Sequence, residues 1–505
     1  MNLTYYIFEK SKGLANKIAI FHRDKTLSYS NLYSLILKVI NEINSLDIKE
    51  HEKIIIVADN SIFFIVAYFA IIGSGCVAVP IHPDFGKENF NHVYKTCEVR
   101  YAFIQKKYWK RINTYNISFE RVYSDLDLEG TENIFNIKEE IREVKDVDDR
   151  SDVAVIIFTS GSTDVPKGVM LSHYNIMYNT NSIIEYLELT ESDRVMVVLP
   201  FSYCFGTSLL HTHLRVGGQV VINNLFMFPA KVLREINDKN CTVFAGVPST
   251  FSILLRRSPL KKMKFPSLRL IQQAGGKLTN ALILELKKAL PTTKICIMYG
   301  QTEATARLSY LPPELLDSKL GSIGRGIPGT KIEVLNKNGD LVKPREIGEI
   351  VASGGNIMLG YWQDPEETAK VLKDGKLFTG DLGFNDEEGY IFLTDRAKEI
   401  IKVGGYRVGP KEIENIISKH PDVVEVAIIG IYDELLGEAI KAFVSLTNNS
   451  NLSTKELISY CQQNLPSYKV PKSIEIMASL PKNISNKIDK VILRNWKKKN
   501  KQISF

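Results

Sequence analysis

Residues 158–169 read FTSGSTDVPKGV, and this stretch decides how the rest of the chain is interpreted. Five small hydroxyl-bearing or glycine residues stand in a row at 159–163, directly after the apolar run 153–158, and a proline and a lysine follow soon after. Side chains this small cannot hold a segment together by packing, so its backbone amides and hydroxyls are left for a partner. With the cation of Lys167 close behind, we expect that partner to be an anion.

The glycines are not spaced as in a Walker P-loop, so the segment alone is also compatible with a flexible glycine-serine linker. Its flanks argue against a linker. Residues 153–158 predict a buried strand, residues 169–171 are short and apolar, and Ser172 can cap a helix with isoleucine and leucine side chains on one face. The segment is therefore expected to be a loop held between regular elements.

Length and composition indicate an ordinary globular protein of two or more domains, with 505 residues, 44% apolar and 24% charged. The longest apolar stretch, 62–72, is shorter than the ~20 residues that cross a bilayer, so it predicts a buried helix and no membrane span. The N-terminus lacks the pattern of a secretory signal, which favours a cytoplasmic location. The six cysteines are scattered without the spacing of a zinc site or a disulfide framework.

Charge and histidine patterns give no second kind of site. The net charge is +7, and lysines gather at 487–501, where a solvated surface is the simplest interpretation. Aromatic and basic residues are not interleaved along the chain, so the sequence gives no indication of nucleic-acid binding. His211 and His213 could share one face of a strand as metal ligands, but no third ligand stands nearby, so we do not expect a metal there.

Apolar periodicity predicts an α/β fold in two parts. Up to about residue 395, β-rich runs such as 53–58 and 195–199 alternate with helix-period segments, and the charged segment 139–150 is a surface connector. After TDRAKEIIK, at 394–402, a compact α+β pattern of about 100 residues begins. We expect a large multi-subdomain N-terminal α/β domain, 1–395, and a small C-terminal α+β domain, 396–505.

Three further motifs carry chemistry. YGQTEAT, at 299–305, places Glu303 beside Thr302 after a strand, which suits a magnesium ion and a phosphate oxygen. FTGD, at 378–381, ends in a carboxylate that can accept hydrogen bonds from ribose hydroxyls. PKNISNKIDK, at 481–490, presents Lys487 in a turn-rich segment.

Together these strings resemble the adenylate-forming superfamily of acyl-CoA synthetases, nonribosomal adenylation domains and luciferases, and most of all its AMP-forming acyl-CoA ligases. The resemblance runs over nearly the whole chain, through VPIHP at 79–83, KLGSIGRGIPG at 319–329, NIMLGYW at 356–362 and DRAKEIIKVGGYRVGPKEIE at 395–414. It implies ATP-dependent activation of a carboxylic acid as acyl-adenylate, release of pyrophosphate, and transfer of the acyl group to a thiol. ATP, Mg²⁺ and coenzyme A are the implied cofactors.

The resemblance also implies roles for individual residues. Lys487, Thr302 and Glu303 would be catalytic, with Glu303 also holding the metal and Lys398 forming the hinge of a mobile small domain. The implied nucleotide-binding residues are Thr159, Ser160, Gly161, Ser162, Thr163, Lys167, Gly275, Gly276, Tyr299, Gly300, Gln301, Asp381 and Arg396. The implied acid-binding residues are Tyr203, Phe205, Val247 and Thr305.

Three positions depart from the family pattern. Asp164 stands where the phosphate loop usually has glycine, which adds a negative charge near phosphates. Asn486 replaces the glycine before the catalytic lysine, a mild change because asparagine tolerates positive φ. Tyr203 stands in place of a common histidine and keeps an aromatic side chain there.

The sequence leaves the acid and the thiol open. The segment FSYCFG, at 201–206, has no carboxylate to pair with an ammonium, which disfavours a free α-amino acid and favours a fatty, aryl or other modest carboxylic acid. Coenzyme A is the preferred acceptor, and a carrier-protein phosphopantetheine is the alternative. A non-catalytic nucleotide sensor is the alternative of another class, and the oligomeric state is not predicted.

Overall fold

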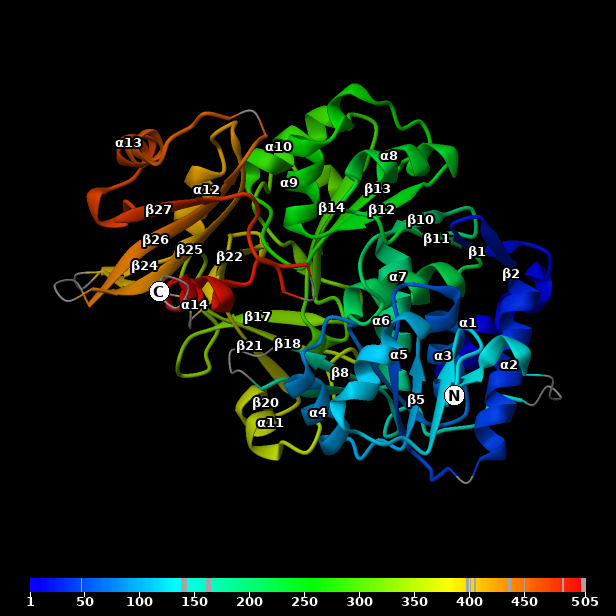
Figure 1. The fold of residues 1–505 in the computed structure, drawn as a ribbon. Coiled ribbons are helices and arrows are strands. Elements are labelled where there is room, and N and C mark those ends of the chain that lie inside the picture. Colours follow the sequence, from blue (N-terminus) through cyan, green and yellow to red (C-terminus); the bar gives the residue numbers. More distant parts are fainter. Residues whose placement is uncertain are drawn as a thin grey trace.

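The computed structural model describes residues 1–46, 48–137, 143–159, 165–396, 399, 401–403, 406–433, 437–448, 450–483 and 486–500. Within them the chain forms a large N-terminal part with three β-sheets and a smaller C-terminal part with one (Figure 1). The smaller part, orange to red in Figure 1, lies against the green helices of the large part.

The first sheet of the large part has a parallel centre and antiparallel edges. Its strands, in the order in which they pair, are β16 (Arg325–Gly326), β15 (Ser309–Leu311), β14 (Lys294–Tyr299), β13 (Leu270–Gln273), β12 (Val243–Gly246), β10 (Arg194–Val197), β11 (Gln219–Ile222), β1 (Ile18–His22) and β2 (Lys25–Ser28). The carboxyl ends of its parallel strands meet at one edge, where ligands bind in open α/β sheets.

The second sheet includes the hairpin that flanks the glycine-serine segment. Its strands, in order of pairing, are β19 (Gly360–Tyr361), β9 (Lys167–Ser172), β8 (Val153–Thr159), β4 (Val77–Ile81), β3 (Lys53–Val57), β5 (Tyr101–Ile104), β6 (Arg121–Ser124) and β7 (Glu132–Asn133). β8 and β9 are antiparallel, and their pairing ends with Thr159 opposite Lys167. β8 and β9 thus form a β-hairpin, and residues 160–164 between them lie outside the described residues.

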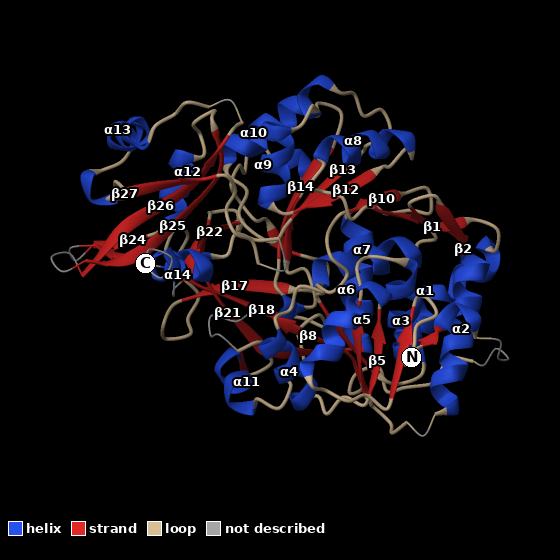
Figure 2. Ribbon diagram, viewed as in Figure 1, coloured by secondary structure: helices blue, strands red, loops and turns tan. Residues whose placement is uncertain are grey.

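Helices fill the space between the two sheets and cover their outer faces (Figure 2). The inner helices, which share one apolar core with both sheets, are α1 (Leu3–Phe8), α2 (Tyr29–Ser45), α3 (Ile62–Gly73), α6 (His173–Tyr186) and α7 (Cys204–Arg215). On the outer faces lie α4 (Lys87–Thr96), α5 (Lys106–Ile112), α8 (Pro229–Asp238), α9 (Pro248–Arg257) and α10 (Asn280–Ala289). α3 is buried all round, which explains its uniformly apolar sequence.

A third, antiparallel sheet completes the large part. It consists of β17 (Lys331–Leu335), β18 (Gly348–Ser353), β21 (Lys376–Asn385), β20 (Leu372–Lys373) and β22 (Ile391–Arg396), with α11 (Pro365–Val371) beside it. Between β18 and α11 the chain crosses to the second sheet, where β19 pairs with β9. The third sheet is therefore joined to the hairpin that carries Lys167.

The C-terminal part has its own apolar core. Its strands are β24 (Tyr406–Val408), β23 (Ile401–Val403), β26 (Gly437–Leu446), β25 (Val423–Asp433) and β27 (Ser473–Met477), and its helices are α12 (Pro410–Ile417), α13 (Thr454–Asn464) and α14 (Lys490–Asn500). The described 3-10 turns of the chain are Glu9–Leu14, Asn113–Tyr115, Ile134–Asn136, Leu260–Lys262, Thr302–Ala304, Pro313–Leu315 and Ser467–Lys469.

The predicted fold class is confirmed, and so are most of the predicted elements. The strand predicted at 53–58 is β3, Ser172 caps α6 through a capping box with Asn175, and Pro410 begins α12. Residues 143–150 form no helix or strand, and 138–142 lie outside the described residues. The strand considered for His211 and His213 is wrong, because both lie inside α7.

Candidate active site

The YGQTEAT motif leaves the carboxyl end of β14 and turns sharply. Gly300 lies so close to the chain that returns from this turn that a Cβ atom there would stand 2.1 Å from the carbonyl oxygen of Ala306. Only glycine fits such an approach. Thr302 and Glu303 follow in the 3-10 turn Thr302–Ala304, both partly exposed at the end of the sheet. The local sequence thus presents a hydroxyl and a carboxylate at the edge where ligands bind.

Glu303 is held by a tyrosine from β19. The hydroxyl of Tyr361 donates to Glu303 Oε1 at 2.9 Å, and burial, together with the charge of Glu303, raises the pKa of Tyr361 above its ordinary value. The ammonium of Lys167 stands 5.3 Å from the centre of the Tyr361 ring. Tyr361 thereby links the carboxylate of one motif to the lysine of another.

Lys167 forms an ion pair with Glu367 of α11. Hydrogen bonding to Lys167, and then to Lys370, lowers the pKa of Glu367 to about 2. The side chain of Lys167 remains 21% exposed despite this ion pair. Of the predicted phosphate loop, Ser160, Gly161, Ser162, Thr163 and Asp164 lie outside the described residues.

Asp381 lies beside Tyr299. The hydroxyl of Tyr299 donates to Asp381 Oδ2 at 2.8 Å, and both side chains are buried. Asp381 pairs in the third sheet with Arg396, whose side chain is not among those described. The predicted residues from the YGQTEAT and FTGD motifs are therefore brought together from the first and third sheets.

Lys487 is presented by a tight loop of the C-terminal part. Asn483 accepts a hydrogen bond from the backbone amide of Lys487 through its side chain at 3.0 Å, and its own amide donates to the carbonyl of Lys487 at 2.7 Å. Asn486 adopts φ +59°, the conformation predicted for this asparagine in place of glycine. The loop thereby fixes the direction in which the lysine leaves it.

The loop is docked on the large part. A Cβ atom placed on Gly275, whose φ is +80°, would stand 3.4 Å from Lys487 Cε and 2.9 Å from Val247 Cγ1. The hydroxyl of Ser249 donates to the carbonyl of Asn486 at 2.9 Å. The lysine from the small part therefore lies against Gly275 of the large part.

α9 holds the small part in this position. Ser252 donates to the carbonyl of Val424, and Arg257 donates to the carbonyls of Leu446 at 2.8 Å and Ala478 at 3.0 Å. Lys277 of the large part donates to the carbonyl of Leu393 at 3.0 Å. The predicted hinge residue Lys398 lies outside the described residues.

The thiol of Cys204 marks where these groups converge. Its sulfur lies 3.5 Å from Thr302 Oγ1. Burial raises the pKa of this thiol, whereas Thr302 and the positive charges of Arg307 and Lys487 lower it. Thr302 therefore contacts the first residue of α7, and Lys487 and Arg307 lie near enough to act on its thiol electrostatically.

The predicted acid-binding residues gather near the same point. Tyr203 precedes α7, with its ring centre 6.2 Å from that of His82, and Phe205 lies in its first turn. Thr305 donates to the carbonyl of Asn356 at 2.7 Å and has the strained φ +66°. Val247 contacts Gly275, as described above. The structure thus brings all four residues to the surroundings of Cys204, Thr302 and Gly275.

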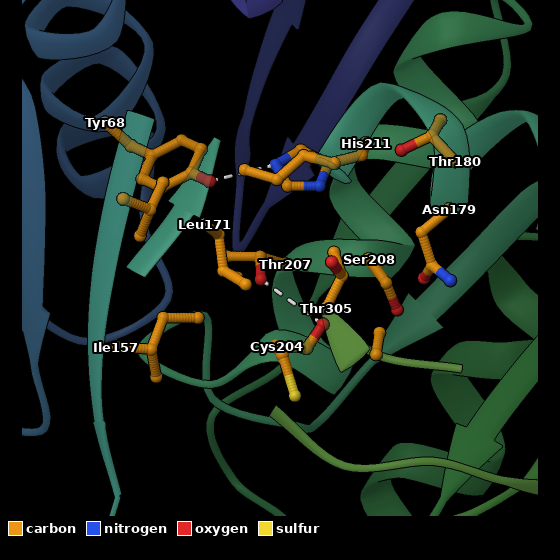
Figure 3. Close-up of a pocket in the computed structure, with 13 residues that line it drawn as sticks. Tyr68, Ile157, Leu171, Asn179, Thr180, Cys204, Thr207, Ser208, His211 and Thr305 are labelled. Carbon is orange, nitrogen blue, oxygen red and sulfur yellow. Dashed lines mark hydrogen bonds between the residues drawn. The ribbon is translucent and has the colours of Figure 1, made fainter. Parts of the chain in front are cut away.

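A cavity continues from Cys204 and Thr305 into the space between the sheets (Figure 3). It offers about 10 Å³ to the centre of a water-sized sphere, which is room for about one water. At its far end Tyr68 and His211 form a hydrogen bond of 3.1 Å, and Thr207 and Ser208 add hydroxyls. Burial lowers the pKa of His211 to about 3.

Three functional neighbours escaped the sequence interpretation. Tyr361 and Glu367 flank Lys167, although the family string at 356–362 contained Tyr361 and could have pointed to it. Arg307, two residues after Thr305, is fully buried, and the neighbouring residues in the sequence did not indicate this burial. No group of three or more His, Cys, Asp or Glu side chains that could hold a metal ion occurs in the described part of the chain. Nor does any helix described there have the length and apolarity to cross a bilayer.

Known proteins share this fold and these motifs. The profile of the family described as AMP-binding enzyme matches residues 7–362, and that of the AMP-binding enzyme C-terminal domain matches residues 412–487. A long-chain-fatty-acid–CoA ligase of Bacillus subtilis is 28% identical over 94% of this chain and 90% of its own. An indoleacetate–CoA ligase of Aromatoleum aromaticum is 28% identical over 97% of each chain.

The fold is also that of a solved enzyme. The crystal structure of the anthranilate CoA ligase AuaEII in complex with anthranoyl-AMP superposes with a TM-score of 0.89, at 24% identity, over 100% of this chain and 98% of that one. The predicted superfamily and enzyme class are confirmed. The chain therefore belongs to the AMP-binding enzyme family, together with the AMP-forming acid–CoA ligases that it matches.

Proposed function

We propose that this protein is an AMP-forming acid:CoA ligase that works in two steps. A carboxylic acid displaces pyrophosphate from ATP to give an acyl-adenylate, and the thiol of coenzyme A then displaces AMP. The observation that carries the proposal is the approach of Lys487 to Gly275, because it brings a cation from the small part to the edge that holds Thr302 and Glu303.

The nucleotide is assigned to the large part. The hairpin from Thr159 to Lys167, with its amides and hydroxyls, is assigned to the β- and γ-phosphates, and Thr302 to the α-phosphate. Asp381 and Arg396 are assigned to the ribose hydroxyls. The adenine-binding residues of the proposal are Tyr299, Gly300, Gln301, Gly275 and Gly276. The hydrogen bond from Tyr299 to Asp381 supports this assignment, since it joins the adenine and ribose residues.

Glu303 suits a magnesium ion that is shared with the nucleotide. Mg²⁺ is commonly bound through one or two carboxylates plus substrate phosphates, and a single partly exposed carboxylate at the sheet edge fits that pattern. Bound there, the ion would supply charge neutralisation at the phosphates. Tyr361 orients the carboxylate, and Lys167 adds a second positive charge on the same side.

Electrostatics explains why these residues are needed. A carboxylate that attacks an α-phosphate brings two anions together, so the transition state requires donors that do not reorganise as the charge moves. Lys487 is held by its loop and by contacts with α9, so its ammonium is positioned beforehand. Loss of one such contact costs about 3–4 kcal/mol, or roughly a hundredfold to a thousandfold in rate.

The acid is assigned to the space bounded by Tyr203, Phe205, Val247 and Thr305. The cavity beyond it is small and partly polar, which favours a modest acid over a long alkyl chain. No carboxylate stands in the FSYCFG segment to pair with a substrate ammonium, so a free α-amino acid remains disfavoured.

The second step requires the thiol to reach the carbonyl of the acyl-adenylate, next to which Lys487 acts in the first step. We therefore assign to the small part, 396–505, a rotation about Lys398 relative to the large part, 1–395. Coenzyme A is the proposed acceptor and a carrier-protein phosphopantetheine the alternative. A cytoplasmic location suits either acceptor and belongs to the proposal.

The test is a panel of carboxylic acids with ATP and Mg²⁺, first without a thiol and then with coenzyme A or a phosphopantetheinylated carrier protein. Pyrophosphate release with at least one acid, followed by a thioester of the expected mass, supports the proposal. Absence of pyrophosphate release with every acid, although ATP binds, would instead favour a nucleotide sensor. A thioester formed on the carrier protein alone would select the alternative acceptor.

A further inference from the structure

Among the described residues, Arg307 is a buried cation without an anionic partner, and it lies next to the predicted acid-binding residues. It is 1% exposed and is the largest fully buried side chain among the described residues. Its guanidinium carbon lies 4.0 Å from the centre of the Phe205 ring. Its other contacts are Met298 Sδ at 3.4 Å from Nε, the carbonyl of Ala306 at 3.3 Å from Nη1, and the hydroxyl of Tyr186.

All four of these neighbours are neutral, and one nitrogen of the guanidinium is left without any of them as a hydrogen-bond partner. Nη2 of Arg307 is buried and has no hydrogen-bond partner in the described part of the chain. No carboxylate among the described residues forms an ion pair with Arg307, and burial lowers the pKa of its guanidinium. A buried charge without an ionic partner is very costly, so such a group is retained where a ligand completes it.

A second arginine, Arg215, has the carboxylate partner that Arg307 lacks among the described residues. Arg215, at the end of α7, lies 4.0 Å from the centre of the Tyr6 ring, the same stacking distance as that of Arg307 on Phe205. Arg215 pairs with Glu9 at 2.8 Å. The two arginines therefore have the same aromatic support, and only Arg307 lacks the carboxylate.

The position of Arg307 is fixed in advance. Its carbonyl accepts hydrogen bonds from Asn179 Nδ2 at 3.0 Å and from Asn356 Nδ2 at 2.8 Å. The backbone is thus held from two sides, and the stacked ring limits the rotation of the guanidinium. A site held in this way can bind an anion without reorganising.

The guanidinium lies two side-chain contacts from the reacting end of the site. Thr302 contacts Cys204, Cys204 precedes Phe205 in the chain, and the ring of Phe205 contacts Arg307. An acid activated beside Thr302 and Lys487 therefore has its far end in the direction of Phe205 and Arg307. A guanidinium fork matches the geometry of a carboxylate, to which it can donate two parallel hydrogen bonds.

We infer that Arg307 selects acids that carry a second anionic group, such as dicarboxylic acids, and binds that group while the other carboxylate is activated. The inference rests on the proposed function, since it assigns the substrate class of the same site. It explains why a cation is kept in an otherwise neutral, buried environment. It also predicts that monocarboxylic acids of equal length are poor substrates, because they leave the guanidinium unpaired.

The test compares matched acids by ATP–pyrophosphate exchange: succinate with butanoate, adipate with hexanoate, and terephthalate with benzoate. For at least one pair, the wild type is expected to favour the diacid in kcat/KM by at least about tenfold, since a site built for a polar group rejects the analogue that lacks it. In R307M this preference should disappear, while the KM for ATP stays within about twofold. R215M is the matched control and should keep the preference.

The outcomes separate the inference from the proposed function. A wild type that turns over monoacids as well as or better than diacids in every pair, or an R307M enzyme that keeps the preference, overturns the inference and leaves the proposed function intact. If no acid supports exchange, the proposed function fails, and titration calorimetry then decides the inference: diacid binding to the wild type but not to R307M supports it, and equal or absent binding overturns it. Should R307M not fold, R307Q serves in its place with the same expected results.

Discussion

The hydroxyl of Tyr361 donates to Glu303 Oε1 at 2.9 Å, across 58 residues of chain. A hydrogen bond to a charged group contributes about 1.5–3 kcal/mol, so Y361F should weaken the use of Mg²⁺ and ATP by about tenfold in kcat/KM. Pyrophosphate release titrated with Mg²⁺ measures this effect. Y432F, at an exposed tyrosine of the small part, is the control and should behave as the wild type. Equal Mg²⁺ dependence in Y361F and the wild type would contradict the positioning role.

Replacement of Lys487 should separate the two steps. K487A is expected to lose adenylation by about a hundredfold to a thousandfold, because the charge that meets the two anions is removed. Thioester formation from a supplied acyl-adenylate should remain within a few-fold of the wild type. K482A removes a lysine of the same loop that pairs with Glu425 at 3.0 Å, and serves as the control. Normal exchange by K487A would rule out the catalytic role.

Arg257 should favour the arrangement in which Lys487 reaches Gly275. R257M removes its hydrogen bonds to the carbonyls of Leu446 and Ala478, so the small part should leave this position more readily. We expect adenylation to fall by about tenfold, with little change in thioester formation from supplied adenylate. R345M, which breaks an exposed ion pair with Glu387, is the control. An equal decrease in both steps would point to a general loss of folding.

Buried histidines should make stability depend on pH. The backbone amide of Leu3 donates to Nδ1 of His173 at 3.0 Å, so this nitrogen carries no proton, and burial lowers the pKa of His173 to about 3. In the unfolded chain His173 has its ordinary pKa of 6.5 and binds a proton that it does not bind in the folded chain. Between these two values stability therefore rises with pH, by about 1.4 kcal/mol per pH unit for each such group. His211 and His213 act in the same direction.

The measurement is the free energy of unfolding at about pH 7.5 and about pH 5.5. H173N keeps an acceptor for the amide of Leu3 but does not titrate, so its stability should fall less on acidification than that of the wild type. An H173N protein as sensitive to acid as the wild type would show that His173 does not stay neutral in the fold.

Local physics accounts for the parts of the fold that the sequence predicted. The buried strand β3, the cap at Ser172 and the helix begun by Pro410 depend on neighbours within a few residues, so their patterns are readable along the chain. His211 and His213 show the limit. Residues separated by one position suggest a strand face, yet the apolar core on both sides of α7 made this segment helical.

The residues of the site also divide into those that the sequence predicted and those that it did not. Lys167, Thr302, Glu303, Asp381 and Lys487 stand in motifs whose residue types match their chemistry, so sequence was enough to nominate them. Contacts between residues far apart in the sequence were not predictable. Tyr361 meets Glu303 only after β19 joins β9. Arg307 becomes an unpaired charge only once α6 and α7 enclose it. Burial and pairing are properties of the assembled sheets.

The pairing of β19 with β9 also bears on where the protein can be divided. The family match to the large part stops at residue 362, directly after β19. A chain shortened there would keep the strand but lose β21 and β22, and with them Asp381 and the surface that packs on Leu308 and Ile323. A homology boundary at 362 is thus not a folding boundary, and autonomous expression of the nucleotide-binding half calls for a terminus beyond Arg396.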